Sequence, residues 1–334
     1  METSYGEDAA SRGRILLFEV DYVPCRRKSR QLGGKGRAVG HAPRFTLTHA
    51  KKVRGAVSQI TQVMEHIIVS VANRVEIYAV EGAELKQIAT HHAPHYVVSL
   101  RVAKTYIIYA DVYQACTLLF WRDRDRQLYP LAKDADAHER RAVGDDLRAD
   151  GGSYCADFVV DAGEMAGAHA LGVVVGDGDR VRLLQYAPLG SDTDRGGQRL
   201  LARADFMVNS DVHCLARHAV PRTDPDSDAA AFACFYAGLD GQVGAFLPCD
   251  EKTFRRLRAL EGVLGNALKH AAGVHPDKHR LASLHARNVL DGALLFRYCS
   301  LARPLQRDLA LAVGTDRATV LETLRRVDGQ VGFL

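Results

Sequence analysis

The feature that most constrains the fold of this chain is a short unit of strands that recurs four times before residue 248. Each unit has a leading strand of small and apolar residues, followed by a hairpin whose second arm is apolar. Polar residues and glycines, which allow the backbone to reverse, separate the two arms. The hairpins are expected at 66–80, 105–121, 170–186 and 230–247, and the leading strands at 55–60, 96–101, 154–160 and 212–218.

The spacing of these units is typical of a β-propeller. Val57 and Val98, in the first two leading strands, are 41 residues apart, and polar loops at 134–150 and 187–198 lengthen the later intervals. A period near 40–45 residues indicates blades of about four strands, because each blade can hide its two apolar faces only against neighbouring blades. We predict a mainly β fold, with a partial WD40-like propeller of about four blades over 13–248 after a disordered N-terminus at 1–12. A β-sandwich with irregular loops is the alternative.

Past Pro248 the apolar period changes from that of strands to that of helices, which predicts a C-terminal α-helical domain over 249–334. Asp250 is expected to cap a helix over 250–270 that stops near Gly273. A second helix is expected at 291–300, and a third with Pro304 in its first turn. The last helix is expected to be capped at its N-terminus by Thr315 or Asp316. The apolar stripe of the first helix is Phe254, Leu257, Leu260, Leu264, Leu268 and Ala271.

Composition and motifs exclude several classes of protein. Hydrophobic residues make up 47% of the 334 residues, yet no apolar run reaches the roughly 18 residues of a membrane span. The seven cysteines include no CxxC pair, which favours a reducing compartment, and the start of the chain lacks the pattern of a signal peptide. We therefore expect a nuclear or cytosolic chain.

No motif of catalysis or cofactor binding occurs. GxSxG, the Walker loop and HExxH are missing, so we expect no enzyme activity and no cofactor. The histidines have no cysteine or carboxylate at metal-ligand spacing, so no metal site is expected. Asp177 and Asp179 look like part of a calcium loop, but they fit a hairpin turn better because the other oxygen ligands are missing. Trp121 ends a strand and is expected in the core between blades.

The most basic segment runs from Tyr22 to Met64, with ten Lys or Arg and no Asp or Glu. Gly33, Gly34 and Gly36 lie among the cations, so we interpret 22–54 as a flexible loop that contacts phosphate backbones. Only Phe45 could stack on a base. The alternative is a solvated insertion or a nuclear-import patch. The candidate nucleic-acid contacts are Arg26, Arg27, Lys28, Arg30, Lys35, Arg37, Lys51, Lys52 and Arg54, and Arg44 completes the run.

A second basic group lies on the polar side of the helix expected at 250–270. Arg255, Arg256 and Arg258 are candidates for contact with an acidic partner or RNA. The alternative is that they form only the solvated face of an amphipathic helix.

Two long motifs around the change from strands to helices carry a family resemblance. They are LDGQVGAFLPCDEKTFRRL at 239–257 and NVLDGALLFRYCSLARPLQRDLALAVGT at 288–315. Both resemble the C-terminal region of the large A subunit of cleavage and polyadenylation specificity factor. Shorter segments resemble the same family in the same order: GRILLFEV at 13–20, KVRGAVSQI at 52–60 and RLLARADFMVNSD at 199–211.

The resemblance implies a non-enzymatic scaffold subunit of the nuclear complex for pre-mRNA 3′-end cleavage and polyadenylation. Similar proteins have three propellers and a helical domain, and they hold a WD-repeat subunit and a zinc-finger subunit that together recognise the AAUAAA signal. Direct RNA contact by the chain itself would be auxiliary. Because this chain is far shorter than the family norm, a separate polypeptide is expected to supply the other blades, unless the gene model is incomplete. The superfamily leaves two alternatives: a cullin ubiquitin-ligase adaptor that binds damaged DNA, and a splicing-complex scaffold.

Overall fold

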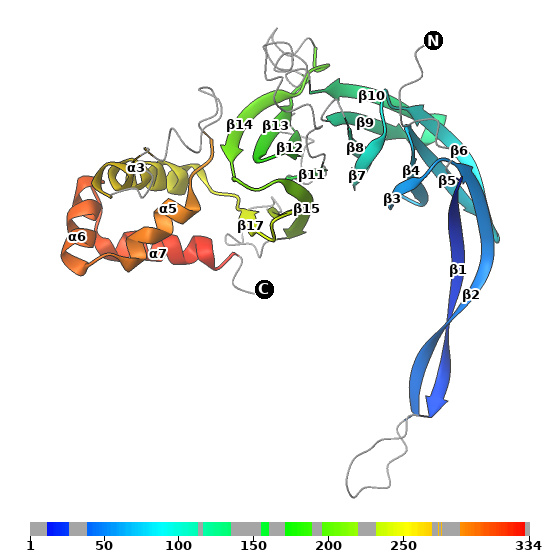
Figure 1. Ribbon diagram of the computed structural model, residues 1–334, viewed down its shortest axis with the longest axis horizontal. Helices are drawn as coiled ribbons and strands as arrows, with labels where there is room; N and C mark the ends of the chain where they lie inside the picture. The colour runs from blue at the N-terminus through cyan, green and yellow to red at the C-terminus, as the bar shows by residue number, and fades with distance from the viewer. Residues whose placement is uncertain are drawn as a thin grey trace, which may run out of the picture.

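The computed structural model describes residues 12–26, 39–112, 116–134, 155–159, 171–188, 196–219, 232–268, 273, 275 and 288–330. It shows a series of β-sheets with a long two-stranded arm on one side and a group of helices on the other (Figure 1). The expected mainly β class with helices near the C-terminus is confirmed. Within the described part of the chain, no helix has both the length and the apolar character needed to cross a membrane.

Four antiparallel sheets follow one another along the chain, and in each sheet neighbouring strands are consecutive in sequence. The first contains β3 (Val57–Val63), β4 (His66–Val71), β5 (Arg74–Glu81) and β6 (Glu84–His92). The second contains β7 (Val97–Ala103), β8 (Tyr106–Asp111), β9 (Cys116–Arg122) and β10 (Gln127–Lys133), with a short 3-10 helix η1 (Asp123–Asp125) before β10.

The third sheet contains β11 (Cys155–Phe158), β12 (Leu171–Asp177), β13 (Arg180–Tyr186) and β14 (Leu201–Met207). The fourth contains β15 (Val212–Ala219), β16 (Phe232–Gly238) and β17 (Val243–Phe246). All four predicted leading strands and all four predicted hairpins are therefore present. Asp179 lies in the turn between β12 and β13, as expected.

The sheets pack face to face in the order of the chain. Trp121 and Tyr109 of the second sheet are buried with Val75 of the first, so the predicted inter-sheet position of Trp121 is confirmed. Phe158 lies between the second and third sheets, and Cys234 between the third and fourth. The leading strands contact one another in succession, and the sheets form an open arc (Figure 1). This arrangement fits a propeller-like description, because each sheet hides its apolar faces against its neighbours.

The basic segment expected to be a loop is largely β-structure. β1 (Arg12–Arg26) and β2 (Val39–Arg54) pair along their full lengths as an antiparallel hairpin, which we call the arm. The prediction of a loop is therefore wrong for 22–26 and 39–54, and Arg12 also lies in a strand. Alternating apolar residues give each strand a continuous apolar face, which favours cross-strand pairing over a solvated loop. Residues 1–11 and 27–38 lie outside the described residues.

The base of the arm is anchored on the first sheet. Ile15 of β1 and Val53 of β2 are buried with Val71, Tyr78 and Leu85. Beyond this anchor the arm extends away from the sheets (Figure 1).

The helices form their own apolar core. They are α3 (Glu251–Ala267), α5 (Gly292–Phe296), η3 (Arg297–Ser300), α6 (Arg303–Ala312) and α7 (Arg317–Asp328). Asp250 caps α3 by accepting from the backbone N–H of Thr253 at 2.8 Å, and Asp316 caps α7. Pro304 lies in the first turn of α6. The shared core contains Leu257, Leu260, Leu264, Leu294, Leu295, Tyr298, Leu309, Ala310, Val320 and Leu324, whereas Ala271 lies outside the described residues.

Candidate interaction surfaces

One face of the arm is apolar and open to solvent. Residues directly opposite each other in an antiparallel pair share a face. Leu16, Phe18, Val20 and Tyr22 of β1 therefore share one face with Ala50, Leu47, Phe45 and Pro43 of β2. We call these eight residues the apolar stripe. Tyr22 is 69% exposed, Phe45 64% and Leu47 52%, so the stripe is uncovered in the isolated chain.

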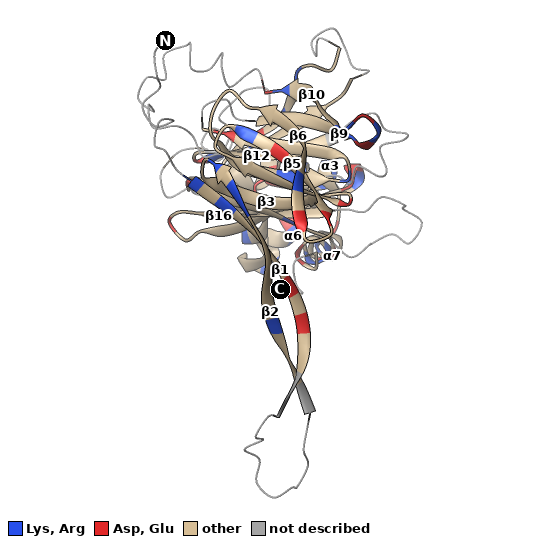
Figure 2. Ribbon diagram, turned by 90° about the vertical axis from the view of Figure 1, so that its right-hand side faces the viewer, with Lys and Arg blue, Asp and Glu red and all other residues tan. Residues whose placement is uncertain are grey.

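The same face becomes basic toward the base of the arm. Arg12 lies opposite Arg54, and Arg14 opposite Lys52, directly before the stripe begins at Leu16. Figure 2 shows basic residues gathered at the end of the arm nearest the sheets. At its described positions from Arg12 to Tyr22 and from Pro43 to Arg54, this face carries no carboxylate. The face therefore combines a basic patch of four cations, Arg12, Arg14, Lys52 and Arg54, with the apolar stripe.

The other face of the arm is mixed in character. It carries Ile15 and Lys51 near the base, and Glu19, Asp21 and Arg44 further out. At its base this face packs on the first sheet through the buried Ile15. Further out it carries charges of both signs, which is typical of a solvated face.

The hairpin structure of the arm places the predicted nucleic-acid contacts on different faces. Lys52 and Arg54 lie in the basic patch, whereas Lys51 lies on the opposite face. The backbone of Arg26 is in β1, and Arg27, Lys28, Arg30, Lys35 and Arg37 lie outside the described residues. Arg12 and Arg14 were not among the predicted contacts, and Phe18 and Tyr22 were not predicted as neighbours of Phe45. The alternation of residue types from Arg12 to Tyr22, combined with that in β2, is the signal that could have revealed them.

The three arginines of α3 are held mainly by contacts within the helical domain. Arg256 Nη1 donates to Thr323 Oγ1 of α7 at 3.2 Å. Arg258 Nη1 donates to Glu261 Oε2 at 2.6 Å, and the other oxygen of this buried carboxylate accepts from the backbone N–H of Asp291 at 2.7 Å. Arg255 forms an exposed ion pair with Glu251 one turn earlier. Their proposed contact with a partner stays a prediction, with Arg255 the most accessible.

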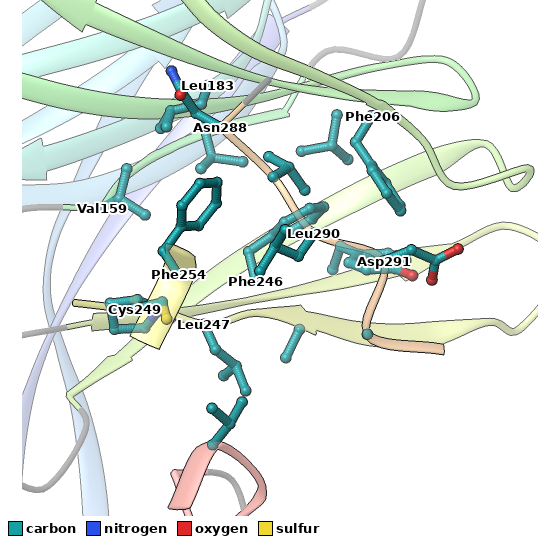
Figure 3. Close-up of a pocket in the computed structure, with 18 of the residues that line it drawn as sticks. Val159, Leu183, Phe206, Phe246, Leu247, Cys249, Phe254, Asn288, Leu290 and Asp291 are labelled. Carbon is teal, nitrogen blue, oxygen red and sulfur yellow. The ribbon is translucent and has the colours of Figure 1, made fainter. Parts of the chain in front are cut away.

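A groove of about 890 Å³ lies where the third and fourth sheets meet the helices. Phe206 of β14, Phe246 of β17, Phe254 of α3 and Leu290 before α5 point into the same space (Figure 3). Cys249, an exposed residue, also lines it, and partial desolvation raises the pKa of its thiol to about 11. That thiol is protonated at neutral pH and is a poor nucleophile. The lining thus indicates an apolar junction between the sheets and the helices.

A polar network links the leading strands of the last three sheets. Asp157 of β11 lies 3.6 Å from Arg101 Nε of β7 and accepts from the backbone N–H of Arg217 of β15 at 3.2 Å. Arg101 also donates to the carbonyl of Leu215, and Arg217 to that of Val102. Burial raises the pKa of Asp157, although its hydrogen bonds and the two arginines act against this. These contacts fix the positions of the last three sheets relative to one another.

Across the described ranges, no group of three His, Cys, Asp or Glu could hold a metal ion.

Successive antiparallel meanders, an anchored arm and a helical domain define a mainly β, propeller-like protein with extended surfaces for contact. The chain belongs to the family described as the CPSF A subunit region, where CPSF is cleavage and polyadenylation specificity factor. The family model matches residues 2–157 and 153–300. The family resemblance seen in the sequence is thus confirmed.

Curated relatives match the chain over nearly all of its length. It is 30% identical over 336 residues to cleavage and polyadenylation specificity factor subunit 1 of Arabidopsis thaliana. It is 29% identical over 339 residues to the probable subunit 1 of Oryza sativa subsp. japonica. It is 23% identical over 348 residues to Protein cft1 of Schizosaccharomyces pombe. Each match covers 98% of this chain but only 21% or 22% of the relative, so the chain spans about one fifth of their length.

Proposed function

We propose that this chain is a non-enzymatic scaffold of the nuclear complex that cleaves and polyadenylates pre-mRNA. The family match and the similarity to subunit 1 of cleavage and polyadenylation specificity factor support membership of this complex. The observation that supports the scaffold role is the anchored arm, whose apolar stripe is uncovered in the isolated chain. Such exposed apolar surface on a folded chain is typical of a site for contact with another protein.

The four sheets are proposed to be blades of a larger propeller over 13–248, followed by the helical domain over 249–334. On the side of the fourth sheet away from the third, Val243 is 72% exposed, and Leu239 beyond β16 is 70% exposed. A neighbouring blade would cover this side, because a blade normally hides both of its apolar faces. This would extend the open arc of the four described sheets toward a closed ring.

The proposed partners are the WD-repeat and zinc-finger subunits of the same complex, which recognise the AAUAAA signal. RNA would be contacted mainly through them. Auxiliary contact would come from cations of the arm, among which Lys52 and Arg54 stand beside Arg12 and Arg14. Such contact would weaken as salt rises, because phosphate binding releases counterions.

The experiment is affinity purification of the tagged chain from nuclei of its own organism, with identification of the partners by mass spectrometry. Co-purification of polyadenylation-factor subunits, and retention on AAUAAA RNA but not on a point-mutated signal, is the expected result. Recovery of a cullin with damaged-DNA receptors, or of splicing-complex proteins, would replace this proposal with one of the two alternatives.

A further inference from the structure

We infer that the apolar stripe and the basic patch of the arm together form a docking site for a partner protein, through an amphipathic segment with carboxylates at one end. The inference rests on the proposed function, because it assumes a protein complex around this chain. It concerns the face that carries Leu16, Phe18, Val20 and Tyr22 opposite Ala50, Leu47, Phe45 and Pro43.

The first support is the physical cost of leaving this surface bare. A two-stranded hairpin is marginally stable in water unless its apolar face packs against something. Among the described residues, the arm is buried only at its base and on its other face, where Ile15 and Val53 pack on the first sheet. Further out, Tyr22 is 69% exposed and Phe45 64%. An occupant that covers the stripe would supply the missing packing.

The second support is charge complementarity. Arg12, Arg14, Lys52 and Arg54 continue the same face directly below Leu16. A partner that covers the stripe therefore meets four cations at one end and uncharged apolar side chains at the other. Carboxylates at the corresponding end of the partner segment would satisfy these cations, and like charges there would be repelled.

The geometry sets the size of the segment. Strand residues rise about 3.4 Å each, so the stripe from Leu16 to Tyr22 is roughly 20 Å long. The carboxylates are then expected roughly 7–14 Å beyond its basic end, opposite Arg14 and Arg12. An amphipathic helix of about 13 residues spans the stripe, and one more turn or two reaches the patch.

A protein segment fits this face better than single-stranded RNA does. RNA platforms use aromatic faces on which bases stack. Here the rings of Phe18 and Phe45 are perpendicular, with centroids 6.5 Å apart, so they pack edge to face on each other. Of the six other residues of the stripe, Tyr22 alone is aromatic.

The test is site-specific photo-crosslinking in the complete complex. Benzoylphenylalanine would replace Leu47 in one sample and Thr46 in another, in the full chain isolated with its cleavage and polyadenylation factor. These neighbours in sequence lie on opposite faces of the arm, since Leu47 pairs with Phe18 and Thr46 with Glu19. We expect the Leu47 position to crosslink to one subunit, at a segment with several apolar residues and at least two carboxylates. The Thr46 position should do so at least fivefold less.

Charge reversal supplies the second measurement. Arg14→Glu with Lys52→Glu should weaken association with the crosslinked subunit at least tenfold. Arg44→Glu, on the opposite face of the arm, should change it less than threefold. Circular dichroism and melting of each variant show whether the sheets remain folded, and the crosslinking result stands without these variants.

The inference is overturned if the chain co-purifies with the factor but Leu47 crosslinks to RNA, to a second copy of this chain, to nothing, or no more than Thr46 does. That outcome would leave standing the proposal that the chain belongs to the factor. Failure of the wild-type chain to enter the factor at all would instead overturn the proposed function, and the docking site with it.

Discussion

Arg182 and Asp134 form a buried ion pair between two sheets. Nη2 of Arg182 in β13 lies 2.7 Å from Oδ2 of Asp134, which follows β10, and these side chains are only 1% and 0% exposed. Asp205 of β14 stands directly opposite Arg182 in the third sheet. Because charges buried without a partner are costly, this pair favours one placement of the second sheet against the third.

Removal of one partner of this pair should strongly destabilise the fold. We predict that Arg182→Met lowers the free energy of unfolding by about 3–5 kcal/mol, because Asp134 then keeps a buried charge without its closest cation. Urea unfolding followed by circular dichroism measures the change. Arg122→Met is the control, since Arg122 forms an exposed pair with Asp125 and such pairs contribute about 0–1 kcal/mol. Equal losses in the two variants would refute the assigned role of the buried pair.

Titration of Asp157 should make the folded chain less stable as pH rises in the acid range, which is the reverse of the usual effect of a carboxylate. Burial raises its pKa in the folded chain above the ordinary value of 3.8, so the folded state holds this proton more tightly than the unfolded state. Its contribution therefore favours folding at low pH and is lost as pH rises through the raised value. Compared with Asp157→Asn, which does not titrate, the wild type should become less stable as pH rises from 3.8. A relative gain of the wild type over the same interval would contradict this prediction.

The helix caps should show the opposite pH dependence. Hydrogen bonds from Thr253 lower the pKa of Asp250, so its stabilising effect is present above 3.8 and is lost as pH falls through the lowered value. At neutral pH, Asp250→Ala should cost about 1 kcal/mol, the usual contribution of an N-cap. Asp308→Ala, at an exposed position inside α6, is the control and should not destabilise the chain. A loss that stays constant from neutral to acid pH would exclude the capping explanation.

Local features of the fold were readable from the sequence. Turn residues between apolar runs located the four hairpins, and the change of apolar period after Pro248 located α3. Asp250 and Asp316 were identifiable as caps because each precedes an apolar stripe of helical period. The fourth strand of each of the first three sheets, such as β10, was not placed individually, because exposed outer strands have a weak apolar pattern.

Contacts between distant segments of the chain could not be predicted from the sequence. Asp134 begins a polar stretch that predicted a loop, and nothing local to it indicates Arg182, 48 residues later, as its partner. The hairpin of the arm was not predicted, because a linear run of cations is also typical of a solvated loop. Alternation divides that run between two faces, with Lys51 on one and Lys52 on the other.

The base of the arm depends on a glycine that permits a close backbone approach. A Cβ added at Gly13 would lie 2.4 Å from the carbonyl oxygen of Gly55, which is backbone and cannot turn aside. We predict that Gly13→Ala shifts β1 at its anchor, lowers the melting temperature and speeds hydrogen exchange of amides in β1 and β2. Gly262→Ala in α3 is the matched control. Its added Cβ meets nothing within 4 Å, and alanine in a helix interior should stabilise the chain by roughly 0.5–1 kcal/mol. Unchanged exchange in the arm of Gly13→Ala would show that the anchor tolerates the shift.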